Sequence, residues 1–155
     1  MTKPEMKPLA DWEKTIDAAR TGDPLWTVQA YRISVYAIAC HNFDRIHNAA
    51  LMNAPAFDQL TRAIGSVAAN IAEGYSRSSV LDRMRFYGYA LGSAREAIAW
   101  YDTTAAELGD TSTARQAMLI QIRRLLLTTV RNARPDVTTL TTPRARRNRR
   151  APDSQ

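Results

Sequence analysis

Three residues with metal-binding chemistry recur at three-residue steps: His41, Asp44 and His47. Imidazole nitrogens and carboxylate oxygens are common ligands of zinc and iron. On a helix, however, these steps spread the side chains over roughly 120° of the surface, which is too wide for one ion. A di-iron bundle also needs two Glu-x-x-His motifs and two more carboxylates, and only Asp44-x-x-His47 comes near. We therefore expect no metal and no other cofactor.

Serine and glutamate residues offer nucleophilic or acid–base chemistry, but their sequence context does not favour it. Ser66 and Ser93 each follow a glycine without the Gly-x-Ser-x-Gly turn that exposes a nucleophile. Glu73 and Glu96 could form a general acid and base pair, although structural roles in an oligomer explain them better. The glycine motifs that bind phosphates or dinucleotides are absent. We expect a protein that is not an enzyme.

Arginine suggests a different chemistry, because its planar guanidinium binds phosphate oxygens and stacks on bases. The chain has 21 Lys and Arg against 15 Asp and Glu, which gives a net charge of +6. We predict that RNA or DNA binds to arginines of the last helix and of the C-terminal tail: Arg123, Arg124, Arg131, Arg134, Arg144, Arg146, Arg147, Arg149 and Arg150. No recognition-helix or RNA-module motif is present, so the contacts should be to the nucleic-acid backbone.

Two other interpretations of the basic residues stay open. Basic helix faces are often ordinary solvated surface. Alternatively, the chain is a scaffold or adaptor whose basic surface docks an acidic protein, without binding nucleic acid.

The apolar residues recur at helical spacing, and strand-like alternation is nowhere sustained. A short first helix is expected from about Asp11 to Arg20. Asp23 and Pro24 then match an N-cap and a first helical residue, so a long second helix should run to about His47.

Three more helices are expected after the turn-rich segment 48–55. The first is amphipathic, with Leu60, Ile64, Val67 and Ile71 on one face. It should stop at Gly74.

The last two helices have capping signals. Ser79 opens a helix that should reach Leu108, with a length of over ~40 Å. Thr113 with Gln116 opens the final helix, which should end at Pro135.

Four substantial helices with short connections predict an all-α fold, an antiparallel up-down-up-down four-helix bundle. Residues 1–22 would form an N-terminal extension with the extra short helix, residues 23–135 the bundle, and residues 136–155 the tail. The tail has five arginines and no large apolar residue after Leu140, so we expect a disordered basic segment.

The helix expected over 79–108 is apolar on two sides. One stripe recurs at heptad spacing: Met84, Leu91, Ile98 and Ala105. A second stripe lies roughly 140–240° away by helical rotation: Phe86, Tyr89, Ala90, Ala97 and Trp100. Such a helix needs partners on both sides. Either the N-terminal helix, with Trp12 and Ile16, covers the second stripe, or copies of this chain associate through it.

The preceding helix carries a polar ridge opposite its apolar stripe, formed by Arg62, Ser66, Asn70 and Glu73. The ridge is either a solvated face or a surface covered by a neighbouring subunit, where its charges would pair across the interface. The predicted oligomer interface combines it with residues that follow: Arg62, Asn70, Glu73, Arg77, Phe86, Tyr89, Ser93, Glu96 and Trp100.

A dense local pattern in the same region resembles a known family. It consists of Asn-Ile-Ala-Glu-Gly at 70–74, then Arg77, Arg85-Phe86, and Gly-Ser-x-x-Glu at 92–96. The segment from about Leu25 to Arg134 is similar to the bacterial four-helix-bundle family of the 23S rRNA intervening-sequence protein.

The resemblance implies a ring of four-helix bundles, commonly a homopentamer, without known catalytic activity. A related branch comprises the accessory variability determinants of diversity-generating retroelements, which bind nucleic acid beside a reverse transcriptase. This branch typically lacks the Asn-Ile-Ala-Glu-Gly signature. The chain resembles the intervening-sequence branch more closely, but a reverse transcriptase or another nucleic-acid enzyme is a possible partner.

The cellular location follows from what the sequence lacks. The N-terminus has no apolar signal region, and no stretch approaches the ~18 apolar residues of a membrane span. The single cysteine, Cys40, cannot form a disulfide within the chain. We expect a cytoplasmic protein that does not act at a membrane.

Overall fold

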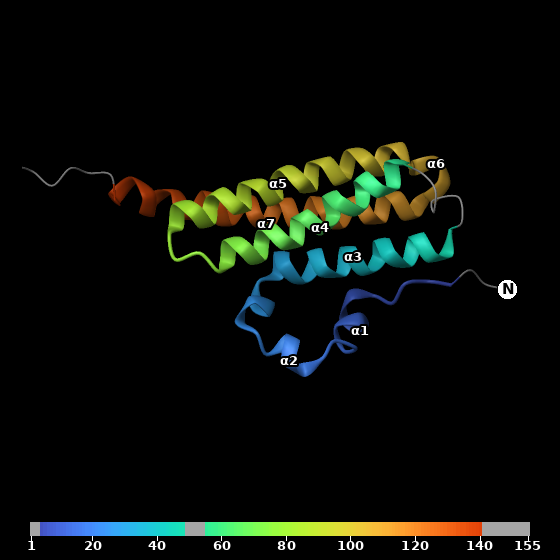
Figure 1. The fold of residues 1–155 in the computed structure, drawn as a ribbon, viewed down its shortest axis with the longest axis horizontal. Coiled ribbons are helices and arrows are strands. Elements are labelled where there is room, and N and C mark those ends of the chain that lie inside the picture. The colour runs from blue at the N-terminus through green and yellow to red at the C-terminus, as the bar shows by residue number, and fades with distance from the viewer. Residues whose placement is uncertain (1–3, 49–54, 141–155) are drawn as a thin grey trace, which may run out of the picture.

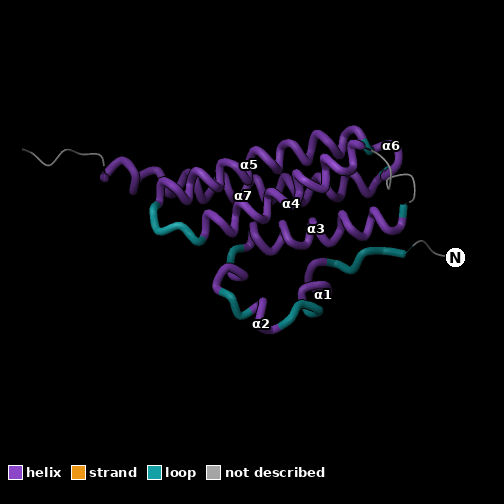
Figure 2. Tube along the Cα trace, viewed as in Figure 1, coloured by secondary structure: helices purple, strands orange, loops and turns teal. Residues whose placement is uncertain are grey.

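The computed structural model describes residues 4–48 and 55–140, and every regular element within them is helical (Figures 1 and 2). This confirms the predicted all-α class. The longer helices are α3 (Gln29–His47), α4 (Pro55–Tyr75), α5 (Val80–Thr103) and α7 (Asp110–Leu140). The shorter ones are α1 (Leu9–Glu13), α2 (Ala18–Thr21), the 3-10 helix η1 (Pro24–Thr27) and α6 (Ala105–Leu108).

The four long helices pack around one core, as Figure 1 shows. Both α4 and α7 contact α3 and α5. The predicted stripe of α4 is completely buried and forms the centre of this core: Leu60, Ile64, Val67 and Ile71. From α7, Leu119, Ile122 and Leu126 complete it. Burial of a large aliphatic side chain contributes about 1.5–3 kcal/mol, so this cluster is the main source of stability.

Helices α4 and α5 approach each other closely where α4 ends. A Cβ atom added to Gly74 would lie 2.8 Å from Cε1 and 2.9 Å from Cδ1 of Tyr87. The ring of Tyr87 is buried and thus occupies the space that a side chain at position 74 would need. Gly74 is therefore required by helix packing, and α4 ends one residue beyond it, at Tyr75.

Helix α3, rather than α5, is the helix buried on two opposite sides. Ala30, Ile33 and Ala37 face the core shared with the other long helices. The stripe of Val35 and Ile38 instead packs with the N-terminal segment, in a second apolar cluster that includes Trp12, Ile16 and Trp26. The N-terminal residues thus cover an apolar helix face, as one of the two predicted alternatives had it, but the face belongs to α3 and not to α5.

The N-terminal segment is more broken than predicted. In place of one helix from Asp11 to Arg20, it forms α1 and α2, because the side chain of Asp17 accepts a hydrogen bond from the backbone N–H of Ala19 and starts a new helix. Asp23 caps as predicted, but it caps η1, and α3 begins only at Gln29.

The long helix predicted over 79–108 is also divided. Ser79 caps α5 as expected, and its hydroxyl accepts from the N–H of Asp82 at 3.4 Å. The helix ends at Thr103, and the next residue, Thr104, caps it: its backbone N–H and its hydroxyl both donate to the carbonyl of Tyr101. Helix α6 follows and ends at Gly109, with φ of 55°. A left-handed φ favours glycine at this turn.

Both predicted ends of the last helix are wrong. Helix α7 begins at Asp110, directly after the turn at Gly109, and the side chain of Gln116 donates to Asp102 instead of forming a capping box. The helix also continues through Pro135 to Leu140. A proline removes one backbone hydrogen bond but does not have to end a long helix. The first part of the predicted tail is therefore helical, and residues 141–155 lie outside the described residues.

His41 is a buried histidine in the core of this fold. Its ring stacks on Phe57 at 4.2 Å, and Nε2 lies 2.7 Å from the hydroxyl of Thr61. Since that hydroxyl donates to the carbonyl of Phe57, Nε2 must carry the proton, and Nδ1 is left without a partner among the described residues. Burial lowers the pKa of His41 to about 4, although the nearby charge of Asp44 opposes the shift.

We expect the free energy of unfolding to fall as the pH drops from about 6.5 toward 4. The unfolded state takes up a proton at His41 in this window while the folded state does not, so stability is present above the unfolded pKa and is lost below it. The loss should reach about 3 kcal/mol. Urea unfolding at several pH values measures it. His41→Leu should flatten this part of the curve, whereas His47→Gln, at the surface, should not. Equal slopes in all three proteins would contradict the assignment.

Gly74→Ala should destabilise the fold by about 1–3 kcal/mol, because the new methyl group overlaps the ring of Tyr87. Gly65→Ala, in the same helix with no atom within 4 Å of its added Cβ, is the matched control and should stabilise by about 0.5–1 kcal/mol. Thermal unfolding of the two variants measures the difference. A Gly74→Ala protein as stable as Gly65→Ala would refute the packing argument.

Candidate functional site

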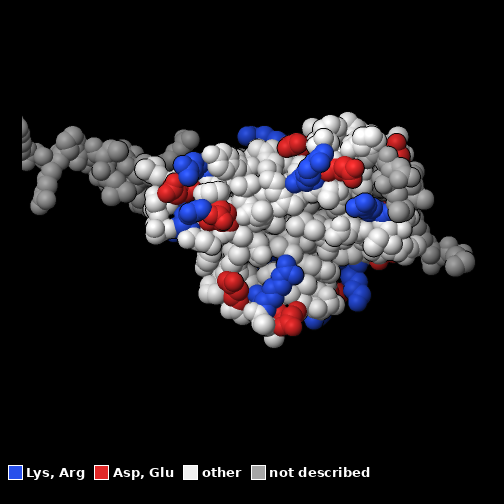
Figure 3. Space-filling view, viewed as in Figure 1, with Lys and Arg blue, Asp and Glu red and all other residues white. Residues whose placement is uncertain are grey.

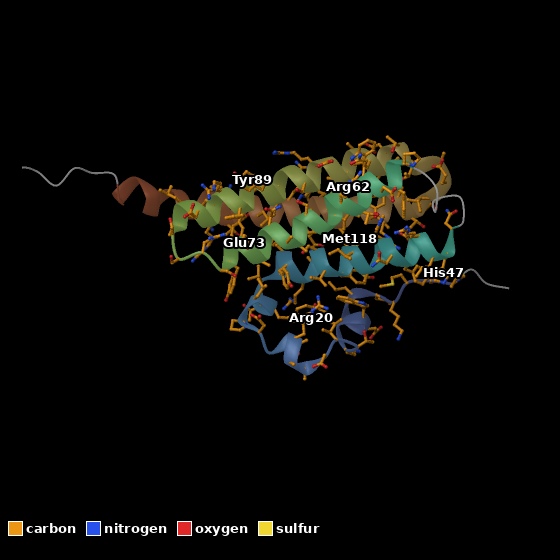
Figure 4. All side chains as sticks on the ribbon, in the orientation of Figure 1. Arg20, His47, Arg62, Glu73, Tyr89 and Met118 are labelled. Carbon is orange, nitrogen blue, oxygen red and sulfur yellow. The ribbon has the colours of Figure 1, made fainter. Side chains whose placement is uncertain are left out.

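The predicted interface residues form one continuous strip across α4, the following turn and α5, which we call the α4–α5 ridge. Its members are Arg62, Asn70, Glu73, Arg77, Phe86, Tyr89, Ser93, Glu96 and Trp100. Figure 4 labels Arg62 and Glu73 on α4 and Tyr89 on the neighbouring α5. The two helices run side by side, so residues that are over twenty positions apart in the sequence become neighbours.

The centre of the ridge is a small hydrogen-bonded cluster. The hydroxyl of Ser93 donates to the hydroxyl of Ser66 at 3.0 Å, which links α5 to α4. The amide of Asn70 donates to the same hydroxyl at 3.0 Å and to the carbonyl of Ser66 at 2.8 Å. Asn70 and Ser93 are thus engaged within one chain, and neither serine is paired with a histidine.

The ridge becomes charged and aromatic near the turn between α4 and α5. Glu73 and Arg77 form an ion pair, and each side chain is close to half exposed. The guanidinium of Arg77 lies 4.9 Å from the ring centroid of Phe86, and that of Arg85 lies 5.7 Å from it. The ring of Tyr89 meets Phe86 edge-on at 5.8 Å. Cation–π contacts of this kind contribute about 0.5–1 kcal/mol at exposed sites and orient both arginines.

At the opposite end of the ridge, the indole N–H of Trp100 donates to Glu96 at 3.4 Å. Arg62 is exposed on α4, and within the described residues no carboxylate lies within salt-bridge distance of it. Glu73 and Glu96 therefore have separate neighbours and do not form the acid and base pair considered from sequence.

The second stripe predicted on α5 is only partly correct. Ala90 and Ala97 belong to the core, whereas Tyr89 is 53% exposed. The N-terminal segment packs on α3 instead, and of this stripe it is Tyr89 that stays mostly exposed. In Figure 3, charged side chains lie toward the two ends of the face that contains α4 and α5, with an uncharged area between them. Depletion of charge is typical of the centre of protein interfaces.

The predicted nucleic-acid residues lie on α7 or beyond it. Arg124 and Arg131 are exposed and stand seven residues apart, so they share one face of the helix, while Arg123 is half-buried. Arg134 lies on the same helix. The remaining predicted residues lie outside the described residues: Arg144, Arg146, Arg147, Arg149 and Arg150.

The three residues with metal-binding chemistry have separate partners. His41 is held by Thr61, and Nδ1 of His47 donates to the carbonyl of Phe43 at 2.8 Å. The carboxylate of Asp44 accepts two hydrogen bonds from Arg115 of α7. Within residues 4–48 and 55–140, no three His, Cys, Asp or Glu side chains gather as metal ligands.

A buried ion pair between Asp44 and Arg115 is the feature that sequence reasoning missed. Nε and one terminal nitrogen of Arg115 each donate to an oxygen of Asp44 at 2.8 Å. Burial alone would lower the pKa of Arg115, but the hydrogen bonds and charge of Asp44 outweigh it and raise that pKa. The partners are 71 positions apart, so no local pattern signals the pair.

Burial also affects two groups beside this pair, Tyr36 and Cys40. The hydroxyl of Tyr36 donates to the carbonyl of Lys7 at 2.6 Å, and burial raises the pKa of Tyr36 to about 12. Burial also raises the pKa of Cys40, which disfavours its nucleophilic thiolate form.

In the part of the chain that the structure describes, no helix is long and apolar enough to span a membrane.

Comparisons with known proteins agree with this fold. A model of the family described as 23S rRNA-intervening sequence protein matches residues 33–125, well over half of the chain. A solved structure of a protein of unknown function from the S23 ribosomal protein family of Bacteroides thetaiotaomicron VPI-5482 superposes with a TM-score of 0.55 at 18% identity, over 65% of this chain and 94% of that chain. No curated protein matches.

The matched segment contains the signature residues 70–74 and 92–96, and it leaves out the N-terminal segment and the end of α7. The structural neighbour, at its low identity, supports the fold alone. The predicted resemblance is confirmed: the chain belongs to the 23S rRNA-intervening sequence protein family.

Proposed function

We propose that this chain is a non-enzymatic homo-oligomer, a pentameric ring, that binds RNA or DNA through its basic surfaces in the cytoplasm. It would act as an accessory factor, alone or beside a nucleic-acid enzyme such as a reverse transcriptase. The observation that carries the proposal is the uncovered α4–α5 ridge together with the arginines of α7.

We further infer that the long helices form an up-down-up-down four-helix bundle. The alternating course of α3, α4, α5 and α7 in Figure 1 supports this order. In this arrangement the ridge runs along the outside of the bundle, where a second copy has access to it.

Self-association accounts for the composition of the ridge. Tyr89 and Phe86 present aromatic surface, and a solvated helix face gains nothing from it. Aromatic residues and arginine are enriched where protein surfaces meet. In the small cluster at the centre, the hydroxyl of Ser93 and the amide N–H of Asn70 already donate hydrogen bonds, so these donors stay paired when another subunit covers them.

A non-catalytic role is supported by the partners of the candidate reactive groups. Glu73 is paired with Arg77, Glu96 with Trp100, and Ser66 with Asn70 and Ser93. Each group thus has a structural contact that explains its presence.

Nucleic-acid binding is supported by the continuity of α7. Because the helix extends to Leu140, Arg124, Arg131 and Arg134 lie on one element that leads directly into the five tail arginines. Copies in a ring would multiply this charge, and the field of several copies attracts a polyanion more strongly than one chain does.

Sedimentation equilibrium should show a species much heavier than one chain of 17.3 kDa, with five copies as the expected stoichiometry. Tyr89→Glu should return it to the monomer, because a buried unpaired charge in an interface costs several kcal/mol. Leu127→Glu, on the exposed surface of α7 away from the ridge, is the control and should leave assembly intact. A wild-type monomer at micromolar concentration would rule out the proposed assembly.

Binding of mixed RNA and DNA should weaken steeply with salt. Removal of residues 143–155 should flatten the plot of log affinity against log salt by about 0.7 per lost phosphate contact with single strands. Fluorescence anisotropy across a salt series measures this slope. Absence of binding even at about 50 mM salt would contradict the proposal and favour an adaptor that docks an acidic protein.

A further inference from the structure

The two ends of the helical body differ in charge. At one end, which we call the turn end, the turn between α4 and α5 meets the first turn of α3 and the C-terminal part of α7: Tyr75, Arg83, Ala30 and Ala133 line one hollow of about 350 Å³ there. At the other end, the side chain of Asn48 at the close of α3 donates to the carbonyl of Glu107 in α6.

Arginines outnumber carboxylates at the turn end. On the long helices and the turn between α4 and α5, those with described side chains are Arg32, Arg77, Arg83, Arg85 and Arg131, against Glu73 and Asp82, with Glu13 of the N-terminal segment beside Arg32. The other half of the long helices and α6 balance their charges, with carboxylates at Asp44, Asp58, Glu96, Asp102, Glu107 and Asp110 against Arg45, Arg62, Arg95, Arg115, Arg123 and Arg124. The positive field of the helical body therefore lies at the turn end.

The carboxylates at the turn end do not prevent a phosphate from binding. Glu73 pairs with Arg77, and Asp82 lies 3.1 Å from Arg85, but all four side chains are about half exposed. Exposed pairs of this kind contribute only about 0–1 kcal/mol, so a phosphate group can compete for the same guanidiniums.

Among the described residues, no carboxylate lies within salt-bridge distance of Arg83. One of its terminal nitrogens donates to the carbonyl of Arg77 at 3.0 Å, which fixes the guanidinium at the rim of the hollow. Its Nε has no hydrogen-bond partner among the described residues.

Aromatic surface accompanies these charges. Tyr75 is 38% exposed at the end of α4, in the wall of the hollow. A groove that combines arginines with exposed aromatic rings is typical of sites for single-stranded nucleic acid, because each unpaired base has a face that stacks on a ring or a guanidinium. The bases of a duplex are already stacked on one another and are not available in this way.

The predicted tail joins the body at this same end. Helix α7 passes Ala133 in the wall of the hollow and continues to Leu140, after which the five tail arginines follow in the sequence.

We propose that the turn end is the docking site for single-stranded nucleic acid, with Arg83, Arg85 and Arg131 binding phosphates and Tyr75 stacking a base. This inference rests on the nucleic-acid binding proposed above and assigns it to one end of the molecule and to one class of strand. It extends the binding surface from α7 to the start of α5. Arg77 and Phe86 lie at the border between this site and the α4–α5 ridge.

The test uses the full chain and a fluorescein-labelled single-stranded RNA of about 20 nucleotides and mixed sequence. Arg85→Gln/Arg131→Gln removes two exposed charges from the turn end. Arg45→Gln/Arg95→Gln removes two exposed charges from the other half and is the matched control. We expect the first pair to weaken binding about tenfold near 150 mM salt and to flatten the salt slope by about 1.4, and the control pair to change affinity less than twofold.

The strand class is tested separately with Tyr75→Leu and with a duplex of the same sequence as competitor. Tyr75→Leu should weaken single-strand binding by about fivefold or more, since a stacked base contributes about 1–3 kcal/mol, and should leave duplex binding unchanged.

The possible outcomes separate the two proposals. Equal losses in the two arginine pairs would overturn the location at the turn end while nucleic-acid binding stands. Equal affinity for duplex and single strand would overturn the strand class. A wild-type chain that binds neither RNA nor DNA would overturn the proposed function itself. Unchanged sedimentation of both arginine pairs verifies that a loss of affinity does not come from a change in assembly.

Discussion

Close approach of α4 and α5 is the constraint on which the rest of this structure depends. At Gly74 the buried ring of Tyr87 occupies the position of a side chain, and further along α5 the core-facing residues Ala90, Ala94 and Ala97 are small and fully buried. Small residues let two helices pack with little distance between their backbones. On the outer side of the two helices, the hydroxyl of Ser93 can therefore donate a hydrogen bond to the hydroxyl of Ser66 at 3.0 Å.

The family signature at 70–74 combines several physical roles within two helical turns. Ile71 is fully buried in the core, and Gly74 permits the contact with Tyr87. Asn70 orders the serine cluster, and Glu73 holds Arg77 at the turn. Three signature residues link α4 to α5. Gly74 contacts Tyr87 directly, whereas Asn70 acts through Ser66 and Glu73 acts through Arg77. The signature therefore describes how α4 and α5 pair, and the ridge is a consequence of that pairing.

Helix α3 shows how the remaining helices are fixed. One side contributes Ile33 and Ala37 to the common core, and the other is covered by Trp12 and Trp26 of the N-terminal segment. On the core-facing side, seven residues after Ala37, Asp44 meets Arg115 of α7 in a bidentate ion pair. Removing one partner of a buried pair leaves an uncompensated charge, at a cost of about 3–5 kcal/mol, so this pair sets the register of α3 against α7.

The sequence by itself determined the all-α class, the family, the buried stripe of α4, the end of α3 at His47 and the cap at Ser79. These features depend on residues within a few helical turns of one another, so spacing along the chain reveals them. The ridge was also predicted from the rotation of side chains about each helix.

Only the tertiary structure decided which faces are covered. It placed the N-terminal aromatic residues on α3 rather than α5, paired Asp44 with Arg115 across 71 positions, and gathered Arg77, Arg83, Arg85 and Arg131 at one end of the body. The helix boundaries at Thr104, Gly109 and Leu140 also differ from the local signals, because packing against neighbouring helices outweighs capping propensities of about 1 kcal/mol. A contact between distant segments depends on how whole helices pack, and no local pattern in one sequence contains that information.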